Sequence, residues 1–165
     1  MTSEHLLHTI PPIYDRNSKI LILGSFPSVK SREVSFYYGH PQNRFWRVRA
    51  AVLGCAVPSS NEEKTALLHS HNIALWDIIK SCDIVGSSDS SIKNVVPNDI
   101  GTILSSCGIR QIYSNGKTSE KLFNKYIKDT VGRDTVALPS TSPANASYNL
   151  ERLTDSWSVI KNNIR

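Results

Sequence analysis

Four short apolar segments, each followed by small or polar residues, constrain the fold of this chain most strongly. They occupy residues 19–25 (KILILGS), 73–79 (IALWDII), 109–114 (IRQIYS) and 135–138 (TVAL). Segments that are apolar at nearly every position are typical of strands covered on both faces. Helical patterns lie between and after them, at residues 43–53, 61–71, 99–106, 117–127 and 149–164. This alternation predicts an α/β protein, a three-layer α/β/α domain with a central four-stranded, mostly parallel sheet.

The length of the chain and the lack of internal repeats predict a single domain over residues 1–165. One polar segment interrupts the alternation at residues 85–98, where Ser, Asp and Asn dominate, and this composition predicts a long loop. No run of about 18 apolar residues is present, so we expect no membrane span. The first twelve residues lack the basic and apolar regions of a secretory signal.

The three cysteines, Cys55, Cys82 and Cys107, are far apart and form no CxxC pair. This spacing argues against a zinc or iron–sulfur site, so we expect no metal, no cofactor, and reduced thiols in a cytoplasmic protein. The net charge is +5 and the pI is about 9.2. Clustered Lys and Arg attract phosphates, so the charge favours a nucleic-acid partner, although many basic proteins bind none. We expect the chain to act as a monomer.

Small polar segments follow all four predicted strands. They are residues 24–28 (GSFPS), Asp77, residues 114–116 (SNG) and residues 139–143 (PSTSP). In open parallel sheets, ligands bind at the carboxyl ends of the strands, so these segments are predicted to meet at one edge. A glycine at the first strand end would let a ligand approach the backbone closely. An ordinary strand-to-helix loop would explain the same sequence.

The segment 36–46 (FYYGHPQNRFW) combines aromatic residues with an asparagine that opens a helix. Asn43 could direct its amide into a pocket at the sheet edge, and helix capping alone would also explain it. Phe45 and Trp46 could simply pack under the sheet.

The segment 139–147 (PSTSPANAS) contains two prolines that brace three small hydroxyl residues. Small hydroxyls and exposed amides can hold phosphates without base specificity. A braced loop of small residues can also enter a duplex as a wedge. A tight surface turn is the alternative interpretation.

Taken in order, GSFPS, HPxNxFW, ALWD, SNG and LPSTSPAN closely resemble the motifs of the hypoxanthine (deoxyinosine) DNA glycosylases, the sixth family of the uracil-DNA glycosylase superfamily. The resemblance runs over residues 20–157, nearly the whole chain. The PxNRFW element is shared with mismatch-specific uracil glycosylases, whereas GSFPS and LPSTSPAN point to the deoxyinosine branch. The resemblance implies a uracil-DNA glycosylase-like fold and a base excision repair enzyme whose partner is DNA containing deaminated bases. Such an enzyme hydrolyses the bond between base and sugar after the nucleotide has been flipped out of the duplex.

The resemblance also implies that Asn43 is the catalytic residue. Relatives that excise uracil usually carry an Asp or Asn in the first motif, which handles the attacking water. That position corresponds here to Phe26, whose side chain cannot orient water. Asn43 would orient the water instead, because an amide is a poor general base. This shift favours hypoxanthine over uracil as the substrate, in a hydrolysis without a lyase step or a metal.

The remaining site residues fall into two groups. The predicted base-binding residues are Gly24, Ser25, Phe26, Phe45, Asp77 and Asn115, and the predicted DNA-binding residues are Ser28, Lys30, Ser140, Thr141, Ser142, Ala144 and Asn145. Phe45 is expected to stack on the base, and residues 140–146 to form the wedge. Asp77 is expected to accept from N1–H of hypoxanthine and to repel the N1 lone pair of adenine, with capping or pairing to Arg or Lys as the alternative. The backbone N–H groups of Ser25 and Phe26 could stabilise charge on the departing base.

Three alternative functions remain open. A uracil or mismatch glycosylase of the same fold would release uracil at least as fast as hypoxanthine. A non-catalytic nucleic-acid-binding module would bind without releasing a base. A flavodoxin-like small-molecule enzyme is the third, although neither GxGxxG nor GxxxxGK[ST] occurs, which weighs against dinucleotide and P-loop sites.

Overall fold

The computed structural model describes residues 2–165 and contains the predicted parallel sheet. The strand order is β3-β2-β6-β7, and each neighbouring pair is parallel. The strands are β2 (Ile20–Gly24), β3 (Ile73–Asp77), β6 (Gln111–Asn115) and β7 (Thr135–Leu138). The four predicted strands are therefore confirmed, with small shifts at their ends.

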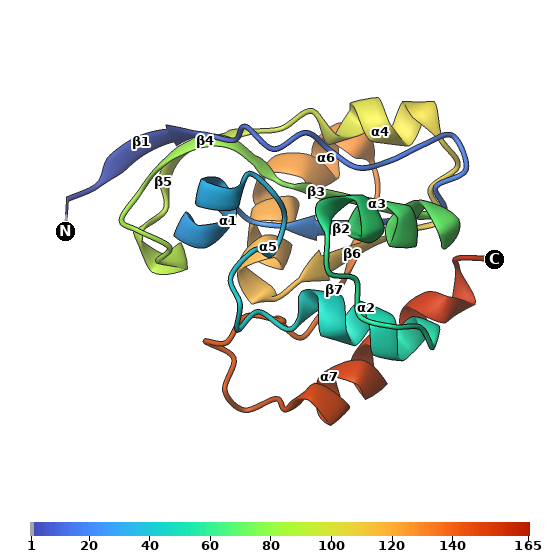
Figure 1. Cartoon of the computed structure of the whole chain (residues 1–165). Coiled ribbons are helices and arrows are strands. Elements are labelled where there is room, and N and C mark those ends of the chain that lie inside the picture. Colours follow the sequence, from blue (N-terminus) through green and yellow to red (C-terminus); the bar gives the residue numbers. More distant parts are fainter. Residues whose placement is uncertain (1) are drawn as a thin grey trace.

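The central strand β2 is buried on both faces, as its continuous apolar sequence predicts. Ile20 and Ile22 belong to one core cluster, and Leu21 and Leu23 belong to a second. Successive side chains of a strand point to opposite faces, so the two clusters lie on opposite sides of the sheet. Figure 1 shows α2 and α7 together on one side, with α4 and α6 on the other, which confirms the three-layer architecture.

The five predicted helical segments are confirmed, although two of them are interrupted, and a sixth segment forms the short helix α1, which the sequence pattern does not predict. Their bounds are α1 (Val29–Val34), α2 (Phe45–Leu53), α3 (Asn61–Ser70), α4 (Ile100–Ser106), α5 (Lys117–Leu122), α6 (Lys128–Val131) and α7 (Leu150–Trp157). A π-helical turn at Phe123–Ile127 joins α5 to α6, and a 3₁₀ turn at Ser158–Asn162 follows α7. No helix formed by residues 2–165 is both long and apolar enough to cross a membrane.

A second, antiparallel sheet has the order β1-β4-β5. It consists of β1 (Glu4–Leu7), β4 (Ile79–Ile84) and β5 (Lys93–Pro97). The prediction of a loop over residues 85–98 is wrong in its second half, because β5 pairs with β4. β5 is a largely exposed edge strand, so its sequence carries no apolar alternation that would reveal it. A 3₁₀ turn, η1 (Asp89–Ser91), lies between the two strands.

The passage from one sheet to the other fixes the floor of the functional site. Only Ile78 separates β3 from β4, and its N–H donates to the carbonyl of Gly24 at 2.9 Å. The buried Asn98 side chain donates to the carbonyls of Asp77 and Ile79, at 2.9 and 3.2 Å. These bonds hold the chain where it changes sheets. They keep Asp77 at the carboxyl end of β3, in register with Gly24 at the end of β2.

Candidate active site

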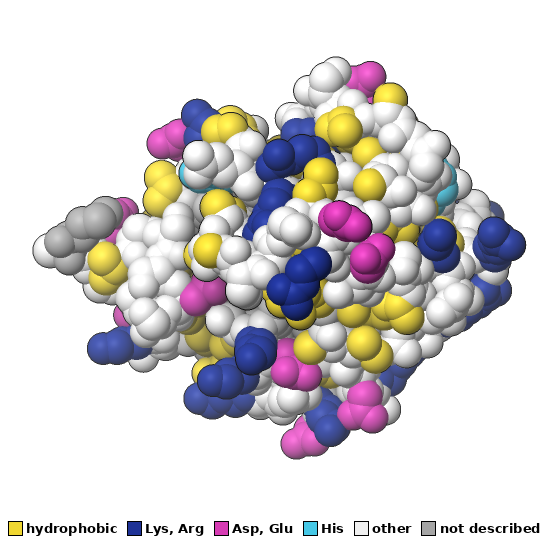
Figure 2. Space-filling model, turned by 90° about the horizontal axis from the view of Figure 1, so that it is seen from below, with side chains coloured by type: hydrophobic (Ala, Val, Ile, Leu, Met, Phe, Trp, Pro, Cys, Tyr) yellow, Lys and Arg dark blue, Asp and Glu magenta, His cyan; other side chains and the backbone are white. Residues whose placement is uncertain are grey.

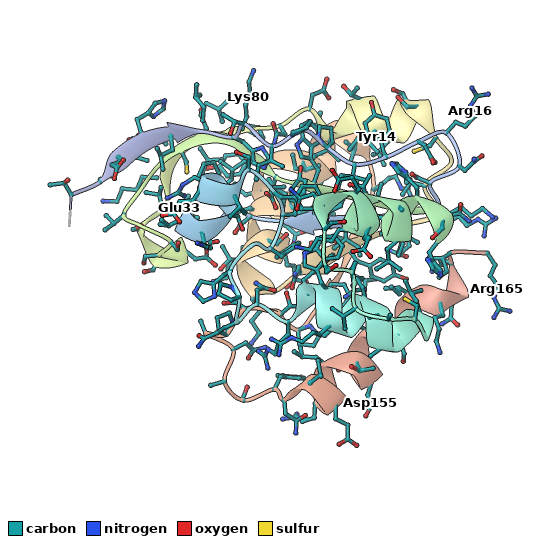
Figure 3. The ribbon with its side chains drawn as sticks, in the orientation of Figure 1. Tyr14, Arg16, Glu33, Lys80, Asp155 and Arg165 are labelled. Atoms are coloured by element: carbon teal, nitrogen blue, oxygen red, sulfur yellow. The ribbon has the colours of Figure 1, made fainter. Side chains whose placement is uncertain are left out.

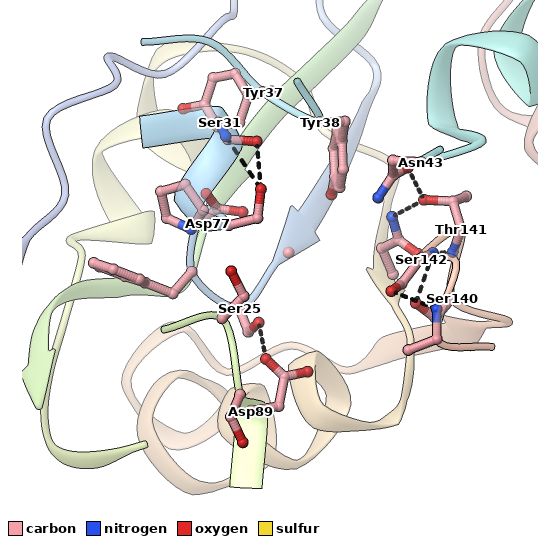
Figure 4. Close-up of a pocket in the computed structure, with 18 of the residues that line it drawn as sticks. Ser25, Ser31, Tyr37, Tyr38, Asn43, Asp77, Asp89, Ser140, Thr141 and Ser142 are labelled. Atoms are coloured by element: carbon pink, nitrogen blue, oxygen red, sulfur yellow. Dashed lines mark hydrogen bonds between the residues drawn. The ribbon is translucent and has the colours of Figure 1, made fainter. Parts of the chain in front are cut away.

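A pocket of about 340 Å³ opens at the carboxyl edge of the parallel sheet (Figure 4). Binding sites for small molecules span about 300–1,000 Å³, so the pocket can hold a single base. Most of the predicted site residues line it: Gly24, Ser25, Phe26, Ser28, Asn43, Asp77, Asn115, Ser140, Thr141, Ser142 and Ala144. The fold therefore brings together five segments that are separated in the sequence.

One wall of the pocket is a hydrogen-bonded group formed by Asn43, Thr141 and Asn115. The Asn43 Oδ1 atom accepts from the backbone N–H of Phe45 at 2.9 Å and from the Thr141 hydroxyl at 2.9 Å. The Asn115 side chain holds the same threonine twice, donating to its hydroxyl at 3.1 Å and accepting from its N–H at 3.1 Å. Thr141 is fully buried and lies between the two amides.

These bonds decide which end of the Asn43 amide faces the pocket. The Phe45 N–H can only donate, so the Asn43 atom beside it must be the oxygen. The Nδ2 group is then the end that faces the pocket (Figure 4). Asn43 therefore presents a hydrogen-bond donor to a bound molecule rather than an acceptor.

Arg44 anchors the loop at residues 139–147 by hydrogen bonds. The guanidinium of Arg44 donates to the carbonyls of Ser142 and Asn145, at 2.8 and 3.1 Å, and to that of Tyr148. Its backbone N–H donates to the Thr141 carbonyl at 3.0 Å. Arginine donors are arranged in a rigid fork, so one side chain fixes several turns of the loop at once.

Two hydroxyls of this loop keep their own hydrogens free. Ser140 Oγ accepts from the N–H of Ser142, and Ser142 Oγ accepts from the N–H of Ala144, both at 3.1 Å. A hydroxyl that accepts one bond can still donate one. Both groups can thus donate to phosphate oxygens. Asn145 is taken up inside the loop, where its side chain donates to the Ser140 carbonyl at 3.0 Å.

The floor of the pocket carries a buried carboxylate. Asp77 is 4% exposed, and its Oδ2 atom lies 2.8 Å from Nε2 of His8. Its Oδ1 atom lies over Gly24, only 2.4 Å from where a side-chain Cβ would stand. The Tyr38 hydroxyl also lies close to Gly24, 2.9 Å from the same Cβ position. Glycine at position 24 therefore admits two polar groups to the pocket floor.

The prediction that Phe45 forms the stacking face of the pocket is not supported by its position. Phe45 is fully buried, and its ring lies stacked against Tyr38, with centroids 4.1 Å apart and planes 11° apart. The guanidinium of Arg49 lies against the Phe45 ring as well, 4.8 Å from its centroid. Tyr38 lines the pocket and Phe45 does not. The stack of aromatic and guanidinium groups thus ends at Tyr38 on the pocket side.

The Tyr38 hydroxyl is buried and has no hydrogen-bond partner among residues 2–165. The Tyr38 backbone adopts a left-handed conformation with φ of 52°. This conformation is uncommon for an aromatic residue and is often found at functional sites. Burial raises the pKa of this hydroxyl, and the nearby Asp77 carboxylate raises it further. The hydroxyl therefore stays protonated and can donate to a ligand.

Two residues predicted to bind DNA have other contacts. Lys30 does not line the pocket; it is on the exposed surface of α1 and lies 3.6 Å from Glu33. Ser28 does line the pocket, but its Oγ atom caps α1 by accepting from the N–H of Ser31 at 3.1 Å. The Phe26 ring is half-buried and packs edge-on against His8, with centroids 6.0 Å apart.

Several residues of the site escape sequence reasoning. Tyr38 lies in the aromatic segment before Asn43, so its proximity in sequence was a usable signal. Arg44 lies in the same segment. His8 follows β1 of the second sheet and Asp89 lies on η1, and nothing in their local sequence points to the pocket.

Lys and Arg side chains are exposed on the side of the molecule that carries α2 and α7. Figure 2 views the side of α2 and α7, where Lys and Arg side chains gather across the middle of the face, interspersed with Asp and Glu. Arg47 of α2 and Arg152 of α7 are exposed, and Arg152 donates to the Ser147 carbonyl in the loop at 2.7 Å. Arg16 and Arg165 project instead at the end of the molecule away from Glu33 of α1 (Figure 3). Within residues 2–165, no group of three or more His, Cys, Asp or Glu could hold a metal ion.

Comparison with known proteins confirms the resemblance. The family model of the uracil DNA glycosylase superfamily matches residues 11–162. Two proteins named hypoxanthine DNA glycosylase are each 34% identical to this chain. The one from Methanosarcina barkeri aligns over 82% of this chain and 85% of its own length, and the one from Methanosarcina acetivorans over 91% and 94%.

A solved structure supports the same assignment. It is the solution NMR structure of a Methanosarcina acetivorans protein described as a uracil DNA glycosylase. It superposes with a TM-score of 0.79 at 32% identity and covers 92% of this chain and 94% of its own. Fold, motif order and sequence identity agree, and the chain belongs to the uracil DNA glycosylase superfamily.

Proposed function

We propose that this chain is a monofunctional DNA glycosylase of base excision repair that releases hypoxanthine from deoxyinosine in DNA. The similarity to two proteins named hypoxanthine DNA glycosylase supports it. The observation that carries the choice of base is the Asp77 carboxylate on the pocket floor, with Oδ1 beside Gly24. Hypoxanthine offers an N1–H to this acceptor, whereas adenine offers a lone pair that a buried charge would repel.

The target nucleotide must leave the duplex before its base can enter a pocket of this kind. Extruding it costs a few kcal/mol, and less for a base that pairs poorly. The hydroxyls of Ser140 and Ser142 would donate to the phosphates that flank it. Pro143 and Ala144, both exposed at the tip of the loop, would press into the gap left behind. The rigid anchoring by Arg44 supports this wedge, since the loop must not yield when it meets the duplex.

Bond cleavage leaves negative charge on the base and positive charge on the sugar. Asn43 would donate from Nδ2, to the departing base or to the oxygen of the attacking water. The N–H groups of Ser25 and Phe26 would add donors near the same charge, as in an oxyanion hole. The residues that line the pocket include no lysine, so no amine is placed for a lyase step. The reaction is then a hydrolysis by water. We expect the protein to act as a monomer.

The function is tested with oligonucleotides that carry a single deoxyinosine, deoxyuridine or deoxyxanthosine. After incubation with the protein, alkali breaks the strand at each abasic site. Fastest cleavage at deoxyinosine is expected. Uracil release at the same or a higher rate would identify a uracil or mismatch glycosylase. Binding without cleavage of any lesion would identify a non-catalytic module.

The reading of the base by Asp77 predicts a change of selectivity in Asp77→Asn. His8 still donates to the remaining oxygen, so the new amide turns its NH₂ toward the base. Deoxyinosine cleavage should fall about 10- to 100-fold, the equivalent of one charge-assisted hydrogen bond of about 1.5–3 kcal/mol. The rate of deoxynebularine cleavage should fall far less, because its purine has an N1 lone pair and no N1–H. An unchanged ratio of the two rates would exclude Asp77 as the reader.

The position of Tyr38 predicts that this ring, and not Phe45, stacks on the base. Tyr38→Leu should slow deoxyinosine cleavage about tenfold, because base–aromatic stacking contributes about 1–3 kcal/mol. Tyr38→Phe keeps the ring and should lose much less. Single-turnover rates with the three proteins test this. Equal rates for Tyr38→Leu and the parent would show that Tyr38 does not stack on the base.

A further inference from the structure

The N-terminal segment places two histidines against two aspartates, in contrasting surroundings. His5 lies on β1, and its Nδ1 atom is 2.8 Å from Oδ1 of Asp83, at an exposed position. His8 follows β1, and its Nε2 atom is 2.8 Å from Oδ2 of Asp77. The side chains of the second pair are only 2% and 5% exposed. The buried pair, unlike the first, shares a member with the pocket.

The direction of the buried hydrogen bond follows from the chemistry of the two groups. A carboxylate carries no hydrogen to give, so Nε2 of His8 must hold the proton and donate it. Oδ2 of Asp77 is then committed to the imidazole. The carboxylate cannot rotate without breaking this bond. Oδ1 is left as the acceptor that lies over Gly24 at the pocket floor.

The surroundings of His8 hold its ring in this position. Its backbone N–H donates to the Lys80 carbonyl at 2.7 Å, which extends the pairing of β1 with β4. Its ring packs against Phe26 and Tyr37, with centroids 6.0 and 6.1 Å apart. Tyr37 is itself fixed by its hydroxyl, which donates to the Pro11 carbonyl at 2.9 Å. The antiparallel sheet thus places the rigidly held His8 donor behind Asp77, at the back of the pocket.

We propose that His8 is a positioning residue for base selection, which holds Asp77 as an acceptor with Oδ1 turned toward N1–H of a 6-oxopurine. This inference rests on the proposed function. His8 does not touch the base and acts only through the carboxylate. Its removal leaves Asp77 free to rotate, so Oδ1 is no longer held where it accepts from N1–H and the preference for a base with this hydrogen falls. Selectivity, and not only rate, therefore depends on His8.

The test compares His8→Leu with His8→Gln. Leucine removes the donor, whereas the glutamine amide can place an N–H near the former Nε2 position. Single-turnover rates are measured on deoxyinosine and on deoxynebularine. His8→Leu should lower the ratio of the two rates about tenfold, and His8→Gln should restore most of it. His5→Leu is the matched control, since it removes the exposed pair from the same segment and should leave the ratio unchanged.

A double-mutant cycle separates positioning from a general loss of structure. In the Asp77→Asn background, His8→Leu should change the selectivity ratio much less than in the parent, because the carboxylate through which it acts is gone. Circular dichroism and melting temperatures identify any variant that fails to fold, and His8→Gln then carries the test. If the parent cleaves deoxyinosine but both His8 variants keep its ratio, the role of His8 is overturned while the proposed function stands. If the parent cleaves no deoxyinosine, the proposed function itself fails.

Discussion

Exchange of Asn43 for aspartate should slow hypoxanthine release about 100- to 1,000-fold, the loss typical of removing one donor that stabilises charge in the transition state. The reason lies in the fixed orientation of the amide. Asn43 accepts two bonds through Oδ1, from the Phe45 N–H and the Thr141 hydroxyl. Aspartate can accept both of these, so the wall of the pocket should persist. It cannot donate, and it places a negative charge beside a base that is becoming negative.

This substitution distinguishes between two roles that Asn43→Ala would confuse. Alanine removes both the donor and the contact to Thr141, so a loss of rate could come from movement of the loop. Aspartate removes the donor and adds a negative charge, but it keeps the contact to Thr141. The measurement is the single-turnover rate on a deoxyinosine duplex, with Gln42→Glu as the control, because it makes the same change at the exposed neighbouring residue. Activity in Asn43→Asp equal to or above that of the parent would mean that this residue activates water through an oxygen.

Substitution of Gly24 by alanine should cost about 100-fold or more in the same rate, since a displacement of about 1 Å at reacting groups can cost that much. The added Cβ would stand 2.4 Å from Oδ1 of Asp77 and 2.9 Å from the Tyr38 hydroxyl. Both groups would have to move. Moving Asp77 also strains its bond to His8, so the melting temperature should fall together with the activity.

Gly108→Ala provides the control for this prediction. A Cβ at Gly108 would meet no atom within 4 Å, and the residue has no left-handed backbone conformation. Its rate and melting temperature should stay close to those of the parent. A Gly24→Ala protein with normal activity on deoxyinosine would show that Asp77 and Tyr38 need not occupy the pocket floor, and would contradict the proposed reading of the base.

The parallel sheet could be predicted because its sequence pattern is local. A strand that is covered on both faces needs apolar side chains at every position, and residues 20–23 supply them. The meeting of the polar segments at the strand ends also follows from the sequence, since parallel strands end at the same edge of a sheet. The edge strand β5 could not be predicted in this way. Most of its side chains face water, so its place is decided by pairing with β4.

The aromatic segment before α2 marks the limit of local reasoning about the site. Phe45 and Tyr38 both belong to FYYGHPQNRFW, and their residue types alone make either a candidate for stacking on a base. Their order in the stack depends on how α2 packs against the sheet. That packing buries Phe45 completely and leaves Tyr38 at the pocket.

The sequence by itself determined the sheet, the order of the motifs and the identity of most residues at the pocket, because these depend on periodicity and on short motifs. Only the tertiary structure decided how those residues are used. In the folded chain the Asn43 amide is oriented so that Nδ2 can donate to a ligand. The Asn115 side chain bonds to Thr141 and so holds the loop, and His8 bonds to Asp77 on the side away from the pocket. The partners and directions of these hydrogen bonds depend on contacts between segments that are distant in the sequence, so a local sequence pattern cannot predict them.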